Sequence, residues 1–248
     1  MSPLMQAAKQ TIKFLSVKSV WLYFLPWLSA VSLGMSVLVQ FFPLIRPSET
    51  ESFVLTVNPW VLGICLTLFA GTVVAEMVKT MRIIFFADST VSPFLPVLTK
   101  DAVRFTAAFA KSMLFAAVAS VATAYAGLYA MSTFLTLPPL GLSLSMTIAA
   151  MLVPYFVIRQ GLTLSAAVAG DDAGLLRSWK MTSGCGLLLS LYYLLIFMAP
   201  LLVAVSVISI VSAGALFGNF LAVLSVFVSV MAQAAFLAYL YVVLKDDA

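Results

Sequence analysis

Long apolar runs constrain this chain more than any other feature of its sequence. One of them, residues 187–210, is apolar almost throughout, and about 20 apolar residues are enough for a helix to cross the hydrocarbon core of a membrane. The 248-residue chain is 63% hydrophobic and 9% charged, whereas about a quarter of the residues in a soluble domain are charged. The chain is therefore predicted to fold within a lipid bilayer.

The pattern of these runs favours helices over a β-barrel. Strands of a membrane barrel alternate between apolar and polar residues, but these runs are continuous. A helical bundle is then the remaining structure that satisfies the backbone hydrogen bonds in lipid. We predict an all-α, polytopic membrane bundle that forms a single integral domain over residues 1–248. The predicted transmembrane helices, about six in number, cover residues 20–42, 53–75, 105–128, 142–158, 187–211 and 217–244.

The distribution of cations predicts which way these helices face. Lys and Arg are retained on the cytoplasmic side of membrane proteins. With the N-terminus inside, the predicted spans place all of the 13 Lys and Arg residues except Arg46 in or beside cytoplasmic segments. Both termini are therefore predicted to be cytoplasmic. This bias explains the net charge of +4 without a nucleic-acid partner.

Residues 1–18 are predicted to form an interfacial helix on the cytoplasmic side. An apolar stripe is formed by Leu4, Ala8, Ile12 and Leu15. Lys9 and Lys13 lie beside this stripe. A basic amphipathic helix of this kind rests on anionic lipid headgroups.

A second cytoplasmic helix is predicted between residues 159 and 184. Asp171 or Asp172 can cap its N-terminus, and Gly184 can end it. Leu175, Leu176 and Trp179 are predicted on one face, with Arg177 and Lys180 on the other. We expect this helix to lie on the membrane surface or against a partner, with Arg177, Trp179 and Lys180 as candidate contact residues.

Three polar residues in the spans are candidate buried or coupling positions. Glu76 lies at the inner end of the second span, Lys111 about two turns inside the third and Gln233 near the middle of the sixth. Such groups normally face the bundle interior. Glu76 is predicted either to pair with Lys79, Arg82 or Lys111 or to serve a coupling ion or substrate. Gln233 is predicted either to bond a neighbouring helix or to line a solute path.

Small residues mark the third span as a candidate central helix. Ala116, Ser120 and Ala124 recur every four residues, a spacing that lets a neighbouring backbone approach closely. The other spans are therefore expected to pack around this one.

Several kinds of chemistry lack the residues that they need. The chain has no histidine, which excludes bis-histidine haem ligation, histidine-assisted nucleophilic catalysis and the usual catalytic zinc sites. Its 9 carboxylates fall mostly in predicted loops, and no P-loop motif is present to bind nucleotide phosphates. We therefore predict no catalytic residue, no cofactor-binding residue and no metal site.

One segment, residues 159–195, resembles a known family. The pattern consists of a polar span end, an apolar interfacial stretch, a polar turn, a short Ser-Trp helix and a Thr-x-Gly entry to the next span. These features are here Arg159, Leu162–Ala169, Asp171–Asp172, Ser178–Trp179 and Thr182–Gly184. It is similar to polytopic bacterial membrane proteins related to the membrane region of glycerophosphodiester phosphodiesterases. The resemblance implies a six-span bundle with interfacial cytoplasmic helices, in the bacterial inner (cytoplasmic) membrane. It does not imply phosphodiesterase activity, which belongs to a separate soluble domain.

These observations favour a non-enzymatic integral membrane protein that scaffolds or regulates a membrane assembly, because few polar groups fall inside the spans. The alternative is a permease subunit of an ATP-driven or ion-coupled transporter, since such transporters also have six spans, cytoplasmic termini and cytoplasmic helices that meet an ATPase. An enzyme that acts on lipid is disfavoured by the missing histidines. The expected partners are the lipid bilayer and either another membrane subunit or a separate ATPase.

Overall fold

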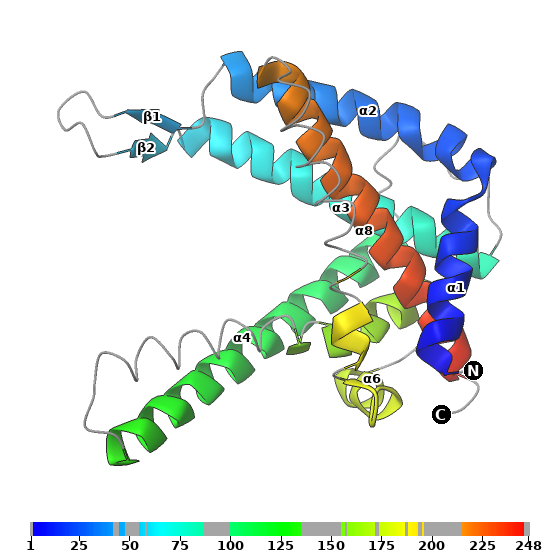
Figure 1. Cartoon of the computed structure of the whole chain (residues 1–248), viewed down its shortest axis with the longest axis vertical. Coiled ribbons are helices and arrows are strands. Elements are labelled where there is room, and N and C mark those ends of the chain that lie inside the picture. The colour runs from blue at the N-terminus through cyan, green and yellow to red at the C-terminus, as the bar shows by residue number, and fades with distance from the viewer. Residues whose placement is uncertain are drawn as a thin grey trace.

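The computed structural model shows a helical protein with one short sheet (Figure 1). In chain order the elements are α1 (Pro3–Leu15), α2 (Lys18–Phe41), β1 (Ile45–Pro47), β2 (Leu55–Val57), α3 (Pro59–Phe86), α4 (Lys100–Phe134), α6 (Leu175–Met181) and α8 (Ala215–Lys245). Residues 158–169 are also helical. The structure describes residues 2–41, 45–47, 55–57, 59–86, 100–134, 155–156, 158–171, 174–186, 188–192, 195 and 215–245.

Four of these helices are long and apolar enough to cross a membrane. The candidate spans within α2, α3, α4 and α8 are Lys18–Leu38, Leu62–Phe86, Lys100–Thr123 and Phe217–Lys245. They correspond to the first, second, third and sixth predicted spans, so the prediction of helices that can cross a bilayer is confirmed for these four. Most of the other two predicted spans, 142–158 and 187–211, lies outside the described residues.

The second span begins and ends later than predicted. Part of the predicted range 53–75 forms β2, which pairs antiparallel with β1. Helix α3 begins at Pro59, and proline is favoured at the start of a helix because the N–H that it lacks would have no partner there. The helix continues past Glu76 to Phe86. A charged residue was wrongly interpreted as the end of this span, because Glu76 is buried inside the protein instead.

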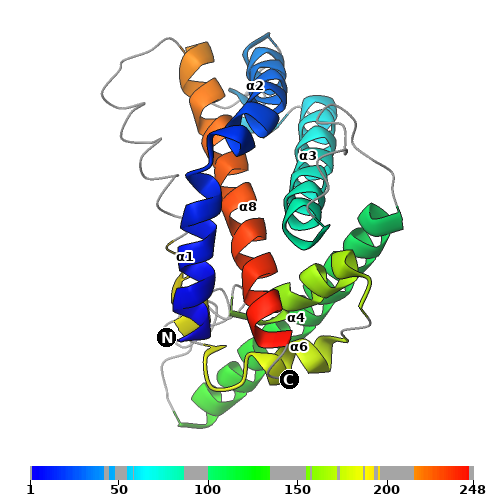
Figure 2. The same cartoon turned by 90° about the vertical axis from the view of Figure 1, so that its right-hand side faces the viewer.

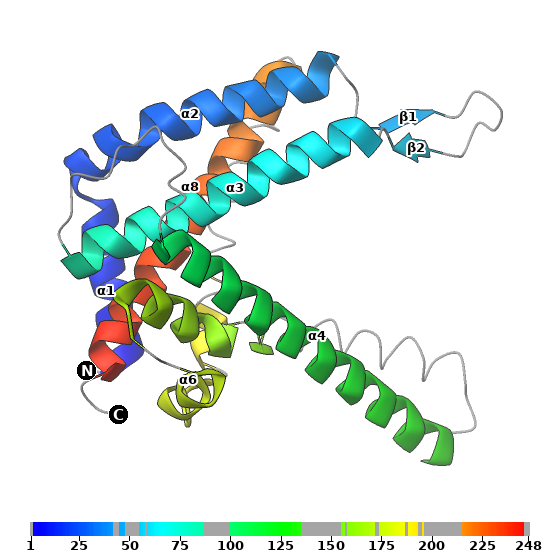
Figure 3. The same cartoon turned by 180° about the vertical axis from the view of Figure 1, so that it is seen from behind.

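Helix α8 is the central helix of the described structure. It packs against α1, α2 and α3, and it lies between them in two perpendicular views (Figures 1 and 2). Helix α4, the predicted centre, diverges from the other long helices (Figure 3), so α8 and not α4 is central among the described helices. Helix α8 is the most apolar of the four candidate spans and also the one most buried inside the protein.

Helix α1 packs against α8 along a different stripe from the predicted one. Ser2 caps its N-terminus by accepting a hydrogen bond from the Met5 amide at 3.4 Å. The buried residues of the helix are Leu4, Ala7, Thr11 and Phe14. Ile12, predicted to be on the apolar face, is 66% exposed. The buried stripe includes Thr11 because its hydroxyl donates to the Ala7 carbonyl at 2.9 Å, which satisfies the polar group within the helix.

Residues 158–169 form a buried helix where the sequence predicted an interfacial stretch. Gly161 allows this helix to approach α8 closely, because a Cβ atom at this position would lie 2.9 Å from Leu237 Cδ2. Leu162 and Ala166 join a core cluster with Phe236 of α8. This helix therefore belongs to the core of the protein.

The two core clusters that include this helix lie at one end of the molecule. One cluster joins residues of α1, the 158–169 helix and the C-terminal part of α8. The other joins the same helix with the C-terminal part of α3 and the start of α4. Both termini are found at this end (Figure 2). The 158–169 helix is therefore held between α1, α3, α4 and the C-terminal part of α8.

Candidate functional site

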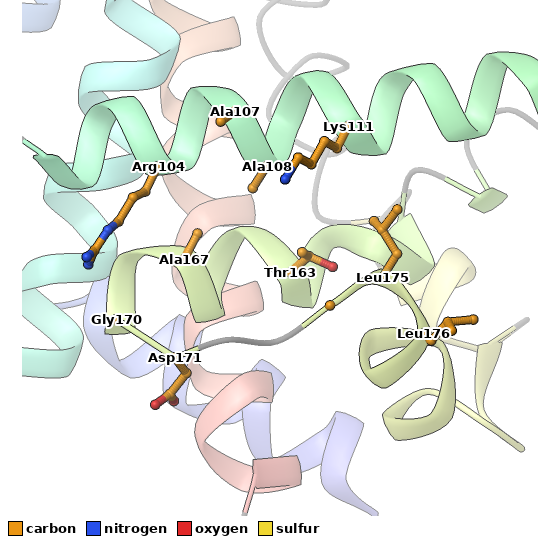
Figure 4. A pocket seen from close by; sticks show the side chains of 11 residues that line it. Arg104, Ala107, Ala108, Lys111, Thr163, Ala167, Gly170, Asp171, Leu175 and Leu176 are labelled. Carbon is orange, nitrogen blue, oxygen red and sulfur yellow. The ribbon is translucent and has the colours of Figure 1, made fainter.

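A groove separates the first half of α4 from the segment that leads to α6 (Figure 4). We call it the α4 groove. Its volume is about 820 Å³. One wall is formed by α4, and the other by the 158–169 helix, the turn at Gly170 and the start of α6. The lining residues are Arg104, Ala107, Ala108, Lys111, Thr163, Ala167, Gly170, Asp171, Gly174, Leu175 and Leu176.

Two cations of α4 face the groove. Arg104 and Lys111 lie two turns apart on the same side of the helix, and both are exposed. Figure 4 shows Lys111 reaching toward the 158–169 helix and Arg104 reaching toward the turn at Gly170. Neither cation forms an ion pair with another described residue. Lys111 was one of three alternative partners predicted for Glu76, and the structure pairs Glu76 with Lys79 instead.

The acidic residue in the groove wall is already neutralised by other groups. Asp171 Oδ2 accepts a hydrogen bond from Lys245 Nζ at 2.7 Å and another from the Tyr241 hydroxyl at 2.5 Å. These two bonds, led by the one from Lys245, hold the pKa of Asp171 below its ordinary value of 3.8. Asp171 therefore joins the turn after the 158–169 helix to the end of α8. The sequence had suggested Asp171 or Asp172 as the cap of α6, but Gly174 is the N-cap residue.

Acidification should weaken this connection. Because the pKa of Asp171 is lowered in the folded protein, its stabilising effect is complete above pH 3.8 and is lost as the pH falls through the folded-state value. The pair is partly exposed, so we expect a loss of at most about 1 kcal/mol. Unfolding in detergent should show a steeper loss of stability below pH 4 for the natural chain than for Asp171→Asn. Equal pH profiles would contradict this assignment.

A polar group inside the groove has no partner. The Thr163 side chain is 8% exposed, and its hydroxyl makes no hydrogen bond with any described residue. Threonine hydroxyls elsewhere in these helices donate to the carbonyl four residues earlier, as Thr67 and Thr106 do. Thr163 therefore lines the groove and carries a buried hydroxyl that has no hydrogen-bond partner among the described residues.

Next to the groove, a buried arginine fixes the position of α6. Arg159 is 7% exposed. Its Nη2 donates to the Trp179 carbonyl at 2.8 Å, its Nε to the Thr182 hydroxyl at 3.0 Å and its Nη1 to the Tyr155 hydroxyl at 3.1 Å. The guanidinium carbon lies 3.7 Å from the centre of the Trp179 ring, and the Ser178 hydroxyl donates to the Arg159 carbonyl at 2.7 Å. We call these contacts the Arg159 clamp.

The clamp determines which residues of α6 face outward. Ser178 and Met181 are buried, and the Trp179 ring stacks on Phe156 with 5.9 Å between centroids. Trp179 was a candidate contact residue, but the structure places it in this aromatic cluster. The other two candidates, Arg177 and Lys180, are exposed. Leu176 is 81% exposed, although the sequence predicted it on the same face as Trp179.

The short helix also differs from the prediction at its ends. Gly174 is the N-cap residue and makes no side-chain hydrogen bond, and the helix ends at Met181. Gly184 follows with a φ of +79°, a left-handed conformation that glycine adopts without steric cost. The prediction that Gly184 marks the stop of this helix is confirmed to within a turn.

A charged pair is buried within the second span. Glu76 is fully buried, and its Oε1 lies 3.8 Å from Nζ of Lys79, which is 3% exposed. The Lys79 ammonium also lies 5.4 Å from the centre of the Trp27 ring on α2. Pairing with Lys79 was one of the predicted arrangements and is confirmed. Arg82, another predicted partner, instead forms an ion pair with Asp101 at the start of α4, at 3.3 Å.

Gln233 is buried in α8, in agreement with its predicted position inside the bundle. Its Nε2 has no hydrogen-bond partner among the described residues. Among the described residues, neither Lys111 nor Gln233 forms an ion pair or a hydrogen bond with Glu76. The α4 groove and the Arg159 clamp were both missed by sequence reasoning, although Arg104, Lys111 and Arg159 are all visible there as cations beside apolar runs.

Comparisons with known proteins add no relative. No family model matches the chain, and neither the curated proteins nor the solved structures include a match. The function of the protein is therefore inferred from its own residues.

Proposed function

We propose that the protein is a non-enzymatic, six-span protein of the bacterial inner membrane that scaffolds or regulates a membrane assembly. Its termini lie in the cytoplasm, and it presents the outer face of α6 to a partner subunit on that side. One observation carries the proposal. The outer face of α6 exposes apolar and cationic side chains, and the buried Arg159 clamp holds this helix in place from the other side.

The outer face of α6 has the composition of a contact surface. Leu176 is 81% exposed, and the cations Arg177 and Lys180 of the same short helix are exposed as well. A central apolar side chain surrounded by charged groups is typical of small protein contacts. The two cations favour an acidic surface on the partner, because complementary charges guide the encounter and fix its register.

The clamp makes this surface suitable for recognition. A helix of seven residues is too short to be stable in water without tertiary contacts. Arg159 provides those contacts by bonding to the Trp179 carbonyl and to Thr182. A surface that is ordered before binding loses less conformational entropy when the partner arrives.

The same contacts support the family resemblance as a proposal. Arg159, Ser178, Trp179 and Thr182 belong to the quoted pattern, and in the structure they are joined by hydrogen bonds. We propose that the pattern represents a structural unit in which a buried arginine supports a short helix. We propose further that the membrane region of glycerophosphodiester phosphodiesterases shares this unit.

Photocrosslinking at α6 tests the proposed contact. With p-benzoylphenylalanine in place of Leu176, irradiation of native membranes should give one discrete adduct with a protein partner. Arg177→Glu with Lys180→Glu should reduce its yield by about tenfold or more, since both charges are reversed. Lys9→Glu with Lys13→Glu, which reverses two exposed cations on α1, is the matched control and should leave the yield unchanged. Adducts with lipid alone would overturn the proposal.

A permease subunit is the second candidate, and the buried Glu76–Lys79 pair favours it. Ionisable groups inside membrane-spanning helices commonly mark ion or substrate pathways, and both Glu76 oxygens lack a hydrogen-bond donor among the described residues. A permease of this kind should co-purify with an ATPase that contacts α6. Substrate uptake that disappears in Glu76→Gln, while the folded yield is unchanged, would favour this candidate over a scaffold.

A further inference from the structure

We propose that the α4 groove binds the phosphate-bearing headgroup of an anionic phospholipid, with Arg104, Lys111 and Thr163 as its ligands. This inference does not depend on the proposed partner, and the groove shares Leu176 with the outer face of α6.

The groups that face the groove are donors with a net positive charge. Arg104 and Lys111 are cations, and neither forms an ion pair with another described residue. The Thr163 hydroxyl is buried and makes no hydrogen bond with a described residue. The carboxylate of Asp171 is held by Lys245 and Tyr241, and in Figure 4 it points away from α4. A ligand that satisfies these three groups must be an anion with several acceptor oxygens, and phosphate fits this requirement.

The walls between the donors are apolar. Ala107 and Ala108 on α4 face Ala167, and Leu175 lies at the far side. A soluble anion gains nothing from this surface, whereas the glycerol backbone and the upper acyl carbons of a lipid would be removed from water there. The volume of about 820 Å³ lies in the range of small-molecule sites, about 300 to 1,000 Å³.

The position of the groove along α4 fits a headgroup. Arg104 and Lys111 lie in the first third of α4, which runs from Lys100 to Phe134, with the apolar, span-forming part of the helix following them. Basic pockets between helices at this level of a membrane hold anionic headgroups. The separation of the two cations, about 10 Å along the helix, allows each to contact a different oxygen-bearing part of one headgroup.

Lipid retention by the purified full-length chain tests the proposal. Protein in mild detergent is incubated with phosphatidylglycerol or with phosphatidylcholine of the same acyl chains, and bound lipid is counted by native mass spectrometry. The natural chain should retain phosphatidylglycerol preferentially. Arg104→Gln with Lys111→Gln should lower its affinity by about 30-fold, or about fivefold for each cation. Lys100→Gln removes an exposed cation of α4 that lies outside the groove lining, and this variant should retain the lipid as the natural chain does.

Thr163→Val separates a binding role from a folding role. The substitution keeps the shape of the side chain but removes the hydroxyl, so it should weaken phosphatidylglycerol binding by about fivefold. Without lipid it should leave the thermal midpoint unchanged or raise it, because a buried donor without a partner is removed. Lower binding with equal or higher stability cannot result from misfolding.

Three results would overturn the proposal. One is equal retention by the groove double variant and by Lys100→Gln, and another is unchanged retention by Thr163→Val. The third is displacement of bound lipid by millimolar inorganic phosphate or glycerol 3-phosphate, which would identify a site for a soluble anion. Persistence of the lipid in the presence of either soluble phosphate supports a lipid site.

Discussion

Replacing Arg159 with methionine should release α6 from the protein. The substitution removes the hydrogen bonds to the Trp179 carbonyl and to the hydroxyls of Thr182 and Tyr155. The Trp179 carbonyl then loses the guanidinium as its donor. Bonds from a charged donor are worth about 1.5 to 3 kcal/mol each, and losing a buried network costs several kcal/mol. We expect a local destabilisation of about 3 kcal/mol or more, which corresponds to a rise of about 100-fold in the open population.

Limited trypsin digestion measures this release directly. Trypsin cleaves after Arg177 and Lys180, which lie on α6 itself, so opening of the helix should accelerate cleavage at these two sites. Arg159→Lys should restore only part of the protection, because an ammonium cannot reproduce the planar set of donors. Arg177→Gln, on the exposed face of α6, is the matched control, with Lys180 as the reporter site. Slow cleavage at Lys180 in Arg159→Met would refute the role of the clamp.

Replacing Lys79 with methionine should produce the other large effect. The change leaves the Glu76 carboxylate fully buried without the lysine that lies 3.8 Å away, and it also removes the contact of Lys79 with the Trp27 ring. Removing one member of a buried ion pair typically costs about 3 to 5 kcal/mol. We expect a loss of stability of this size, measured by denaturant titration in detergent micelles.

A double-mutant cycle distinguishes the ion pair from general packing. Glu76→Gln should cost less than Lys79→Met, because Lys79 keeps its contact with Trp27. The double variant Glu76→Gln with Lys79→Met should recover part of the stability lost in Lys79→Met, since no unpaired charge is left buried. Lys9→Met removes an exposed cation from α1 and should change the stability by less than about 0.5 kcal/mol. Strictly additive losses would show that the two side chains do not interact.

The sequence predicted the long helices well because their signal is local. The apolar runs of α2 and α8 were placed to within a few residues of their observed ends, and α4 was found with its ends extended in both directions. Twenty apolar residues in succession have few alternatives in lipid. The start of α3 was misplaced because strand β2 and the helix are both largely apolar, and only Asn58 and Pro59 interrupt the apolar run in the sequence.

The arrangement of the helices could not be derived in the same way. Small residues at four-residue spacing suggested α4 as the centre, but that pattern shows only that close approach is possible. The high apolar content of α8 could not identify it either, because helices that face lipid are apolar as well. In α1 and α6 the buried stripes include Thr11 and Ser178, which bond to backbone carbonyls. A purely apolar stripe therefore pointed to the wrong face.

The candidate site was partly visible in the sequence. Arg177 and Lys180 were correctly placed on an exposed face of a short helix. The role of Arg159 was missed because it depends on Thr182 and Trp179, which lie about 20 residues later in the chain and are brought near by the turn after the 158–169 helix. The α4 groove requires two segments about 60 residues apart to face each other, a relation that no local pattern contains.

The central position of α8 has a consequence for biogenesis. Helices α1, α2 and α3 all pack on α8, yet α3 ends at Phe86 and α8 begins only at Ala215. At a translation rate of about 5 to 20 residues per second, the ribosome needs on the order of ten seconds to synthesise the intervening chain. During that interval the early helices reside in the membrane before their common partner exists. The buried charges of α3 must then be sheltered by the insertion machinery or by other nascent segments until α8 arrives.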